Sequence, residues 1–161
     1  DGLKTGHTDA AGFCLVTSAK REDMRLIAVV MGSTSDQSRF QEAQALFNWG
    51  FRFYETRRLF PAGEKRTDAP VFGGQEQSVP LGLAEDLYVT VPRGKYGELA
   101  ASVEVAPRLM APVAKGSPQG TLRVKLGDEV LLERPLVAMA DVGEGNIFRR
   151  AIDAARLWWQ E

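Results

Sequence analysis

The side chains with the clearest potential for chemistry lie at the start of the chain. Lys4, Thr5 and Gly6 form a Lys-Thr-Gly tripeptide, and His7, the only histidine, follows directly. In serine acyl-transfer enzymes this tripeptide works with a nucleophilic Ser-x-x-Lys element and a Ser-x-Asn type triplet. The tripeptide therefore predicts one wall of an acyl-transfer site.

The other two elements of such a site are missing. None of the serines is followed by a lysine three positions later. Ser35-Asp36-Gln37 is similar to the triplet, but it follows the tripeptide and is better interpreted as a turn and helix cap. The sequence thus contains one of the three motifs of such an active site. We expect it to be part of a longer polypeptide.

Composition indicates a soluble globular protein, with 44% hydrophobic and 25% charged residues in 161. A net charge of −1 argues against a nucleic-acid partner, which usually needs a basic patch. Cys14 is the only cysteine, so an internal disulfide and a cysteine-based metal cluster are excluded, and we expect this thiol in the core. No metal or other cofactor is predicted.

The first third of the chain predicts strands followed by a helix. Phe13, Leu15 and Val16 precede a polar turn at 20–23, and an apolar run at 24–31 comes next. This pattern predicts a β-hairpin whose second strand is buried on both faces. The polar residues 33–38 offer N-caps for an amphipathic helix from about residue 38 to 56. Its predicted apolar stripe contains Phe40, Ala43, Leu46, Phe47, Gly50, Phe51 and Tyr54.

The middle of the chain predicts a small all-β domain. Short runs of alternating hydrophobicity, broken by Gly and Pro, lie between residues 61 and 142. Gly127-Asp128 between two such runs fits a two-residue hairpin turn. We expect a sandwich or barrel of antiparallel strands.

The last fifteen residues, 147–161, predict an amphipathic helix. An apolar face with Phe148, Trp158 and Trp159 lies opposite Arg149, Arg150 and Arg156. Two interpretations stay open: a terminal helix packed on its own domain, or a helix lying in the plane of a membrane surface.

Six segments together resemble one family. They are 3–8 (LKTGHT), 24–27 (MRLI), 48–53 (NWGFRF), 91–94 (VPRG), 134–137 (RPLV) and 144–148 (EGNIF). The chain resembles, nearly from end to end, the low-molecular-mass penicillin-binding proteins that are serine-type D-alanyl-D-alanine carboxypeptidases.

The resemblance implies an α+β fold in three parts. Residues 1–58 would be the C-terminal strands and helix of a penicillin-binding, β-lactamase-like catalytic domain. Residues 59–145 would be a small all-β, sandwich-like domain, and residues 146–161 an amphipathic helix that associates with a membrane. The implied location is the periplasm, on the outer face of the inner membrane.

The implied reaction removes the terminal D-alanine of a peptidoglycan pentapeptide through an acyl-serine, on a serine that this sequence lacks. By resemblance, Lys4 assists proton transfer and stabilises charge, and Thr5 meets the terminal carboxylate of the substrate. Gly6 lets a peptide lie along the strand, and the backbone N–H of His7 is one of two oxyanion donors. Arg39 matches a family arginine near the substrate carboxylate.

The implied partners are peptidoglycan pentapeptide, β-lactams in the complete protein, and a missing N-terminal half or a domain-exchanged copy. A membrane surface is a further expected partner, through the terminal helix. The alternative hypothesis is a noncatalytic β-domain module that positions the enzyme or docks partners of cell-wall synthesis. The chain alone is expected to be inactive.

Overall fold

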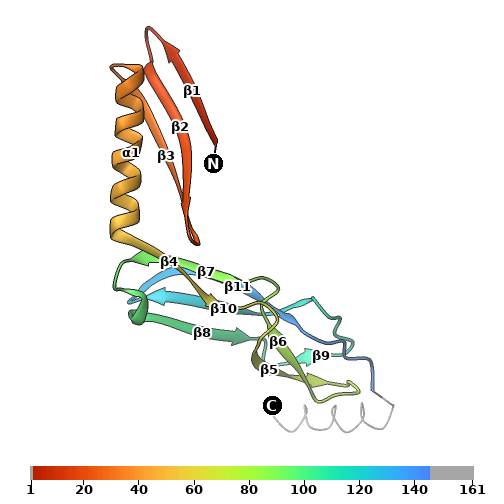
Figure 1. Cartoon of the computed structure of the whole chain (residues 1–161). Coiled ribbons are helices and arrows are strands. Elements are labelled where there is room, and N and C mark those ends of the chain that lie inside the picture. The colour runs from red at the N-terminus through yellow and green to blue at the C-terminus, as the bar shows by residue number, and fades with distance from the viewer. Residues whose placement is uncertain (1, 146–161) are drawn as a thin grey trace. The chain divides into compact units, whose positions relative to one another are not determined.

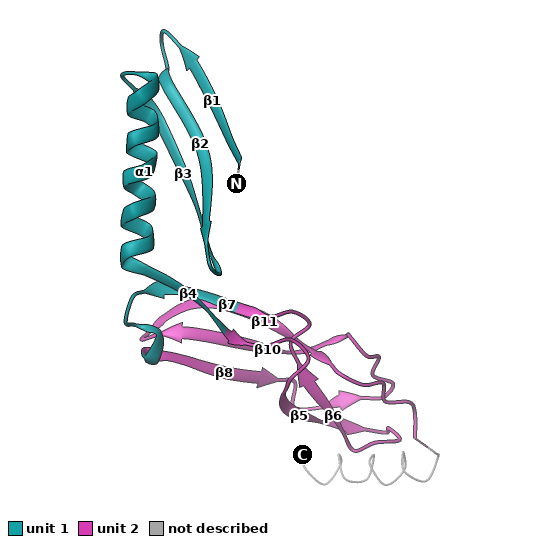
Figure 2. Ribbon diagram, in the orientation of Figure 1, with its two compact units in different colours: residues 1–58, 88–97 teal, residues 59–87, 98–161 magenta. Residues whose placement is uncertain are grey.

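The computed structural model describes residues 2–145. The chain divides into two compact units, coloured separately in Figure 2. Unit 1 contains residues 1–58 and 88–97, and unit 2 contains residues 59–87 and the chain from 98 onward. The chain therefore leaves unit 1 after residue 58 and returns to it for one short segment.

Unit 1 is built on an antiparallel sheet in the order β1-β2-β3. The strands are β1 (Gly2–Thr8), β2 (Gly12–Arg21) and β3 (Met24–Ser33). Helix α1 (Asp36–Phe53) lies along one face of this sheet (Figure 1). Gly12 closes the short β1–β2 turn with a φ of 65°, and a Cβ there would lie 3.1 Å from backbone atoms of Gly32. Only glycine fits this turn without strain.

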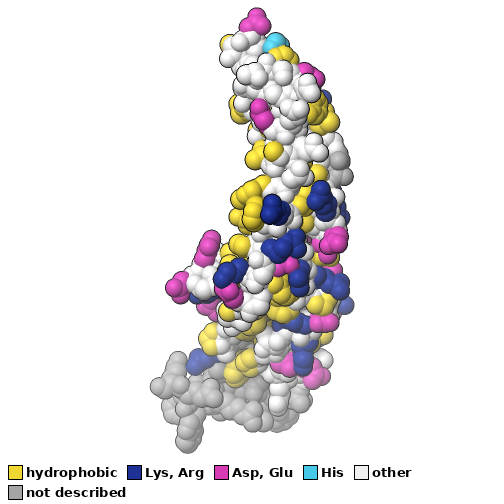
Figure 3. Space-filling model, turned by 60° about the vertical axis from the view of Figure 1, so that its left-hand side comes forward, with side chains coloured by type: hydrophobic (Ala, Val, Ile, Leu, Met, Phe, Trp, Pro, Cys, Tyr) yellow, Lys and Arg dark blue, Asp and Glu magenta, His cyan; other side chains and the backbone are white. Residues whose placement is uncertain are grey.

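Strand β3 is buried on one face only, so the prediction of two buried faces was wrong for this chain. Met24, Ala28 and Val30 are buried, whereas Ile27, Val29 and Met31 are exposed. The alternation arises because α1 covers one face of the sheet and no described residue covers the other. Hydrophobic side chains also reach the surface on the side that Figure 3 shows.

Helix α1 begins two residues before its predicted start and ends three residues before its predicted end. Ser35 is its N-cap and forms a capping box with Ser38, as the polar stretch 33–38 suggested. The buried side of the helix carries Ala43, Gly50 and Phe51, whereas Phe40 and Leu46 are exposed, which corrects the predicted stripe.

The C-terminal end of α1 continues directly into β4 (Tyr54–Phe60), which pairs with β7 (Leu87–Pro92) in a two-stranded sheet. The Arg93 side chain, just after β7, donates hydrogen bonds to the carbonyls of Phe51, Arg52 and Tyr54 at 3.0 to 3.2 Å. Carbonyls in the last turn of a helix have no partner within the helix, so Arg93 acts as a C-terminal cap.

Unit 2 contains a six-stranded sheet in the order β8-β10-β11-β6-β5-β9. Its strands are β5 (Lys65–Phe72), β6 (Ser78–Gly82), β8 (Leu99–Val105), β9 (Leu109–Met110), β10 (Pro118–Leu126) and β11 (Glu129–Ala138), and the 3-10 turn η1 (Tyr96–Glu98) leads into β8. The predicted turn at Gly127-Asp128 is confirmed, because Leu126 pairs with Glu129 and Gly127 has a φ of 60°. All pairings within this sheet are antiparallel except β5 with β9, which is parallel and was not predicted.

A hydrophobic core of its own stabilises unit 2. Val79, Leu81, Val124 and Leu136 are completely inaccessible to solvent. They form one cluster with residues from β5, β9 and the loops around them. Burying a side chain of this kind contributes about 1.5–3 kcal/mol.

The predicted amphipathic helix at 146–161 lies outside the described residues. Among residues 2–145, no helix is long and apolar enough to cross a membrane.

Candidate active site

The predicted site residues Lys4, Thr5, Gly6 and His7 all lie on β1, and every residue of this strand is exposed. Strand β1 is at the edge of its sheet, with β2 on one side and no described strand on the other. An edge strand presents unpaired N–H and C=O groups that can bind an extended peptide. The four residues are therefore available for such pairing.

Strand pairing assigns these side chains to opposite faces of the sheet. Thr5 is opposite Leu15, whose side chain packs in the core under α1, so Thr5 lies on the helix face. Lys4 is opposite Val16, on the other face. Lysine and threonine therefore flank the edge of β1 from its two sides.

His7 lies beside an aromatic ring from the neighbouring strand. It is opposite Phe13, and the two ring centroids are 4.1 Å apart with an interplanar angle of 33°. This stacking restrains the imidazole at the end of β1, close to the β1–β2 turn.

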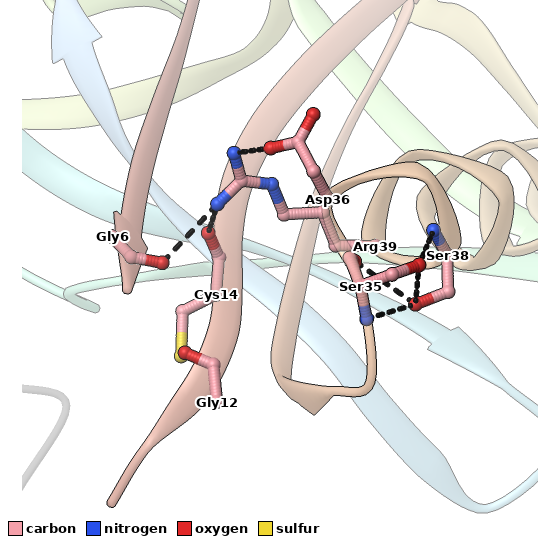
Figure 4. A network of polar contacts seen from close by, with 7 residues as sticks. All are labelled: Gly6, Gly12, Cys14, Ser35, Asp36, Ser38 and Arg39. Atoms are coloured by element: carbon pink, nitrogen blue, oxygen red, sulfur yellow. Dashed lines mark hydrogen bonds and ion pairs between the residues drawn. The ribbon is translucent and has the colours of Figure 1, made fainter. Parts of the chain in front are cut away.

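Arg39 reaches the same strand from the first turn of α1. Its Nη1 lies 3.2 Å from the carbonyl oxygens of both Gly6 and Cys14, to which it donates (Figure 4). Only 7% of Arg39 is exposed. The guanidinium is thus directed at the backbone of β1 and β2.

Three neighbours hold Arg39 in this orientation. Asp36, one helical turn before it, forms an ion pair with Nη2. The guanidinium carbon lies 5.6 Å from the ring centroid of Phe13 and 5.4 Å from that of Phe40. The Ser35–Ser38 capping box, also drawn in Figure 4, fixes the start of the helix that carries both charges.

The structure therefore brings the Arg39 guanidinium together with the Gly6 carbonyl. Sequence reasoning missed Asp36, Phe13 and the Cys14 carbonyl as neighbours of the site. The spacing of Asp36 and Arg39, three residues apart at a helix start, was a signal for their ion pair. Ser35-Asp36-Gln37 is confirmed as a cap.

Cys14 itself is half-buried, and its Sγ lies 3.6 Å from the carbonyl oxygen of Ala11. Within residues 2–145 no three His, Cys, Asp or Glu residues group closely enough to hold a metal ion.

Two protein families match the chain. The family described as penicillin-binding protein 5, C-terminal domain, matches residues 54–144, more than half of the sequence. The family described as D-alanyl-D-alanine carboxypeptidase matches residues 1–35, which include the Lys-Thr-Gly tripeptide.

Individual relatives extend this similarity over nearly the whole chain. D-alanyl-D-alanine carboxypeptidase DacA of Escherichia coli is 40% identical over 158 residues, covering 98% of this chain. DacC of the same organism is 42% identical over 95% of the chain. The crystal structure of penicillin-binding protein 5 from Haemophilus influenzae matches with a TM-score of 0.80 and 40% identity, over 88% of this chain and 42% of that one. The chain spans only 39% of DacA and 38% of DacC.

Proposed function

Because the chain belongs to the family of the penicillin-binding protein 5 C-terminal domain, we propose that it is the C-terminal portion of a serine-type D-alanyl-D-alanine carboxypeptidase. The substrate is a peptidoglycan pentapeptide, and β-lactams are inhibitors of the complete protein. The observation that carries this proposal is the position of Lys4, Thr5, Gly6 and His7 on an unpaired edge strand.

In this proposal the substrate peptide binds along the free edge of β1. A serine from a segment outside this sequence attacks the carbonyl carbon of the penultimate D-alanine. A C–O bond forms, the C–N bond to the terminal D-alanine breaks, and this residue leaves with a proton as the free amino acid. Water then hydrolyses the acyl-serine and regenerates the hydroxyl.

Each site residue has a separate role. The Lys4 ammonium assists proton transfer and stabilises negative charge, and the Thr5 hydroxyl donates to the substrate carboxylate. Gly6 has no side chain to obstruct a peptide. The backbone N–H of His7 donates to the oxyanion, while its imidazole stays stacked on Phe13. Arg39 adds positive charge near the substrate carboxylate without binding it directly, because its Nη1 donates to the carbonyls of Gly6 and Cys14.

The proposed domains are 1–58, the end of the catalytic domain, 59–145, a sandwich-like β domain, and 146–161, a helix that binds a membrane surface. The location that follows is the periplasm. A missing N-terminal half, or a domain-exchanged copy, is the proposed cover for the exposed face with Ile27, Val29 and Met31. Its support is that these apolar side chains are more than half exposed.

A second candidate is a noncatalytic role for the β domain, which would position the enzyme or dock partners of cell-wall synthesis. Its support is that unit 2 has a hydrophobic core built from its own residues, none of which belongs to the predicted acyl-transfer site. The two functions are compatible within one polypeptide.

A chimera tests the proposed activity. This chain replaces the 158 aligned residues of Escherichia coli DacA, and the product is incubated with a labelled penicillin and with a pentapeptide ending in D-Ala-D-Ala. We expect a covalent adduct by intact mass and release of D-alanine. The isolated chain should form no adduct, since it lacks Ser-x-x-Lys. A chimera that unfolds cooperatively but is never acylated would contradict the proposal.

A further inference from the structure

Beyond these roles, we infer that Arg39 is a positioning residue for the peptide unit between Gly6 and His7, orienting and polarising the His7 N–H. The inference rests on the proposed function, in which this N–H donates to the oxyanion. It is carried by the contacts of one nitrogen atom, Nη1 of Arg39, with the backbone of β1 and β2.

The contact fixes which way the Gly6 carbonyl points. Gly6 and Cys14 are directly opposite each other in the antiparallel register. Nη1 of Arg39 lies 3.2 Å from both of their carbonyl oxygens. One atom can reach both oxygens only if they point into the space between β1 and β2, as in the hydrogen-bonded type of antiparallel pair. The Gly6 carbonyl therefore points away from the free edge.

The direction of the His7 N–H follows from the geometry of the peptide bond. In a trans peptide the C=O of one residue and the N–H of the next point in opposite directions. With the Gly6 carbonyl held toward β2, the His7 N–H projects from the free edge, where the substrate peptide is proposed to lie. Arg39 contacts the side of β1 that faces β2, and it thus fixes the orientation of the His7 N–H, the donor that faces the substrate.

The guanidinium also changes how strong this donor is. A hydrogen bond from a cation to the Gly6 oxygen withdraws electron density from the shared amide, which makes the His7 N–H a better donor. Because Arg39 is 7% exposed, water screens this effect little. Oxyanion donors are effective when they are oriented in advance, and this arrangement provides that without substrate.

Burial of Arg39 is costly, which argues against a purely structural role. Its Nε is buried without a hydrogen-bond partner among the described residues. A buried polar atom that lacks a partner destabilises a fold by about 1–3 kcal/mol. Asp36 and the two phenylalanines lower the cost of the cation, yet an apolar side chain would avoid it entirely.

Nuclear magnetic resonance on this chain tests the contact without any activity. We compare wild type with Arg39→Met, Arg39→Lys and the control Arg52→Met, which removes an exposed arginine from the same helix. Arg39→Met should shift the Gly6 carbonyl carbon and the His7 amide proton to lower frequency, the direction expected when a hydrogen bond is lost. Arg52→Met should shift neither. If Arg39→Met leaves both signals of a folded chain unchanged, the inference is wrong. If Arg39→Met unfolds unit 1, Arg39→Lys decides: it keeps the cation on a single nitrogen, so both signals should move part of the way to lower frequency, and unmoved signals would overturn the inference.

Kinetics in the DacA chimera separate positioning from substrate binding. Misplacement of a catalytic group by about 1 Å can cost about 100-fold in rate, so we expect Arg39→Met to lower the acylation rate constant about 10- to 100-fold. The noncovalent dissociation constant of the penicillin should stay within twofold, and Arg39→Lys should restore part of the rate. A peptidyl boronic acid, whose adduct places an oxygen in the oxyanion position, should lose affinity in parallel with acylation.

The possible failures are distinguishable. Equal acylation by wild type and Arg39→Met would overturn the positioning role and leave the proposed function intact. A weakened dissociation constant with an unchanged rate constant would assign Arg39 to the substrate carboxylate instead. If the wild-type chimera is not acylated while the resonance shifts occur as expected, the contact stands and the proposed function fails.

Discussion

The backbone N–H of Gly94 donates to the carboxylate of Glu55 across 3.0 Å. This contact joins the segment after β7 to the start of β4, within unit 1. The Glu55 carboxylate also accepts a hydrogen bond from Arg57 at 3.0 Å. The Gly94 N–H and then the Arg57 side chain hold the pKa of Glu55 below its ordinary value of 4.5, against the opposing effect of burial.

This lowered pKa predicts a pH-dependent contribution to stability. A carboxyl whose pKa is lower in the folded state stabilises the fold above its unfolded pKa, and the contribution is lost as the pH falls through the folded pKa. We therefore expect Glu55→Gln to destabilise unit 1 at pH 7, with a difference from wild type that shrinks below pH 4.5. Unfolding followed from pH 7 to pH 3 measures it, with the exposed Glu76→Gln as control. A difference that is constant with pH would contradict the role of the ionised carboxylate.

Arg93→Met should loosen the end of α1. The variant loses three hydrogen bonds to the carbonyls of Phe51, Arg52 and Tyr54. Because Arg93 is exposed, we expect a loss of about 1 to 2 kcal/mol, toward the lower end of the range for bonds to charged groups. Hydrogen exchange of amides in the last turns of α1 should accelerate about 5- to 30-fold. Arg108→Met, an exposed arginine of unit 2, is the control and should leave these amides unchanged.

The elements predicted correctly are those whose cause is local in the sequence. The turn at Gly127-Asp128 depends on a glycine that adopts a positive φ between two strands. The N-cap Ser35 needs only the backbone of Ser38 nearby. Alternation of hydrophobic residues likewise predicted β7 and β10. Each signal lies within a few residues of the structure it predicts.

The contacts that sequence reasoning missed join distant parts of the chain. Arg39 and Gly6 are 33 residues apart, and Arg93 and Phe51 are 42 apart. No periodicity encodes such pairs, because they depend on the path of the chain.

The error in β3 has a different origin. Its continuous apolar run does imply two buried faces, but within residues 2–145 a helix covers only one of them. The predicted site residues on β1 are Lys4, Thr5, Gly6 and His7. Their proximity follows from their adjacency in the sequence.

The adjacent residues Val29 and Val30 form a matched pair that tests the exposed face of β3. Val30 is 6% exposed and Val29 is 56% exposed. In this chain Val30→Ala should destabilise unit 1 by about 1.5–3 kcal/mol, and Val29→Ala should change stability by less than about 0.5 kcal/mol. Hydrogen exchange of α1 amides reports both.

In the DacA chimera the same pair has a second expected outcome. If an N-terminal half covers the exposed face, Val29→Ala should become destabilising there, while the effect of Val30→Ala stays similar. Sedimentation of the isolated chain is the control for self-association, since a domain-exchanged dimer would also cover Val29. A Val29→Ala variant that remains neutral in the chimera would show that the N-terminal half of DacA contacts another face of this chain.

Lys4→Ala in the chimera should separate catalysis from folding. Lys4 is exposed on an edge strand, so its side chain contributes little to the core and its loss should change thermal stability by less than about 0.5 kcal/mol. Its proposed role is to stabilise charge during acylation, and loss of one such group typically costs about 2.7–4 kcal/mol of transition-state stabilisation. We therefore expect acylation by penicillin to fall about 100- to 1,000-fold at an unchanged melting temperature.

The matched control is Lys20→Ala, which removes an exposed lysine at the far end of β2 and should acylate like wild type. If Lys4→Ala lowers melting temperature and acylation in proportion, this lysine is structural, and the catalytic assignment of the Lys-Thr-Gly tripeptide fails.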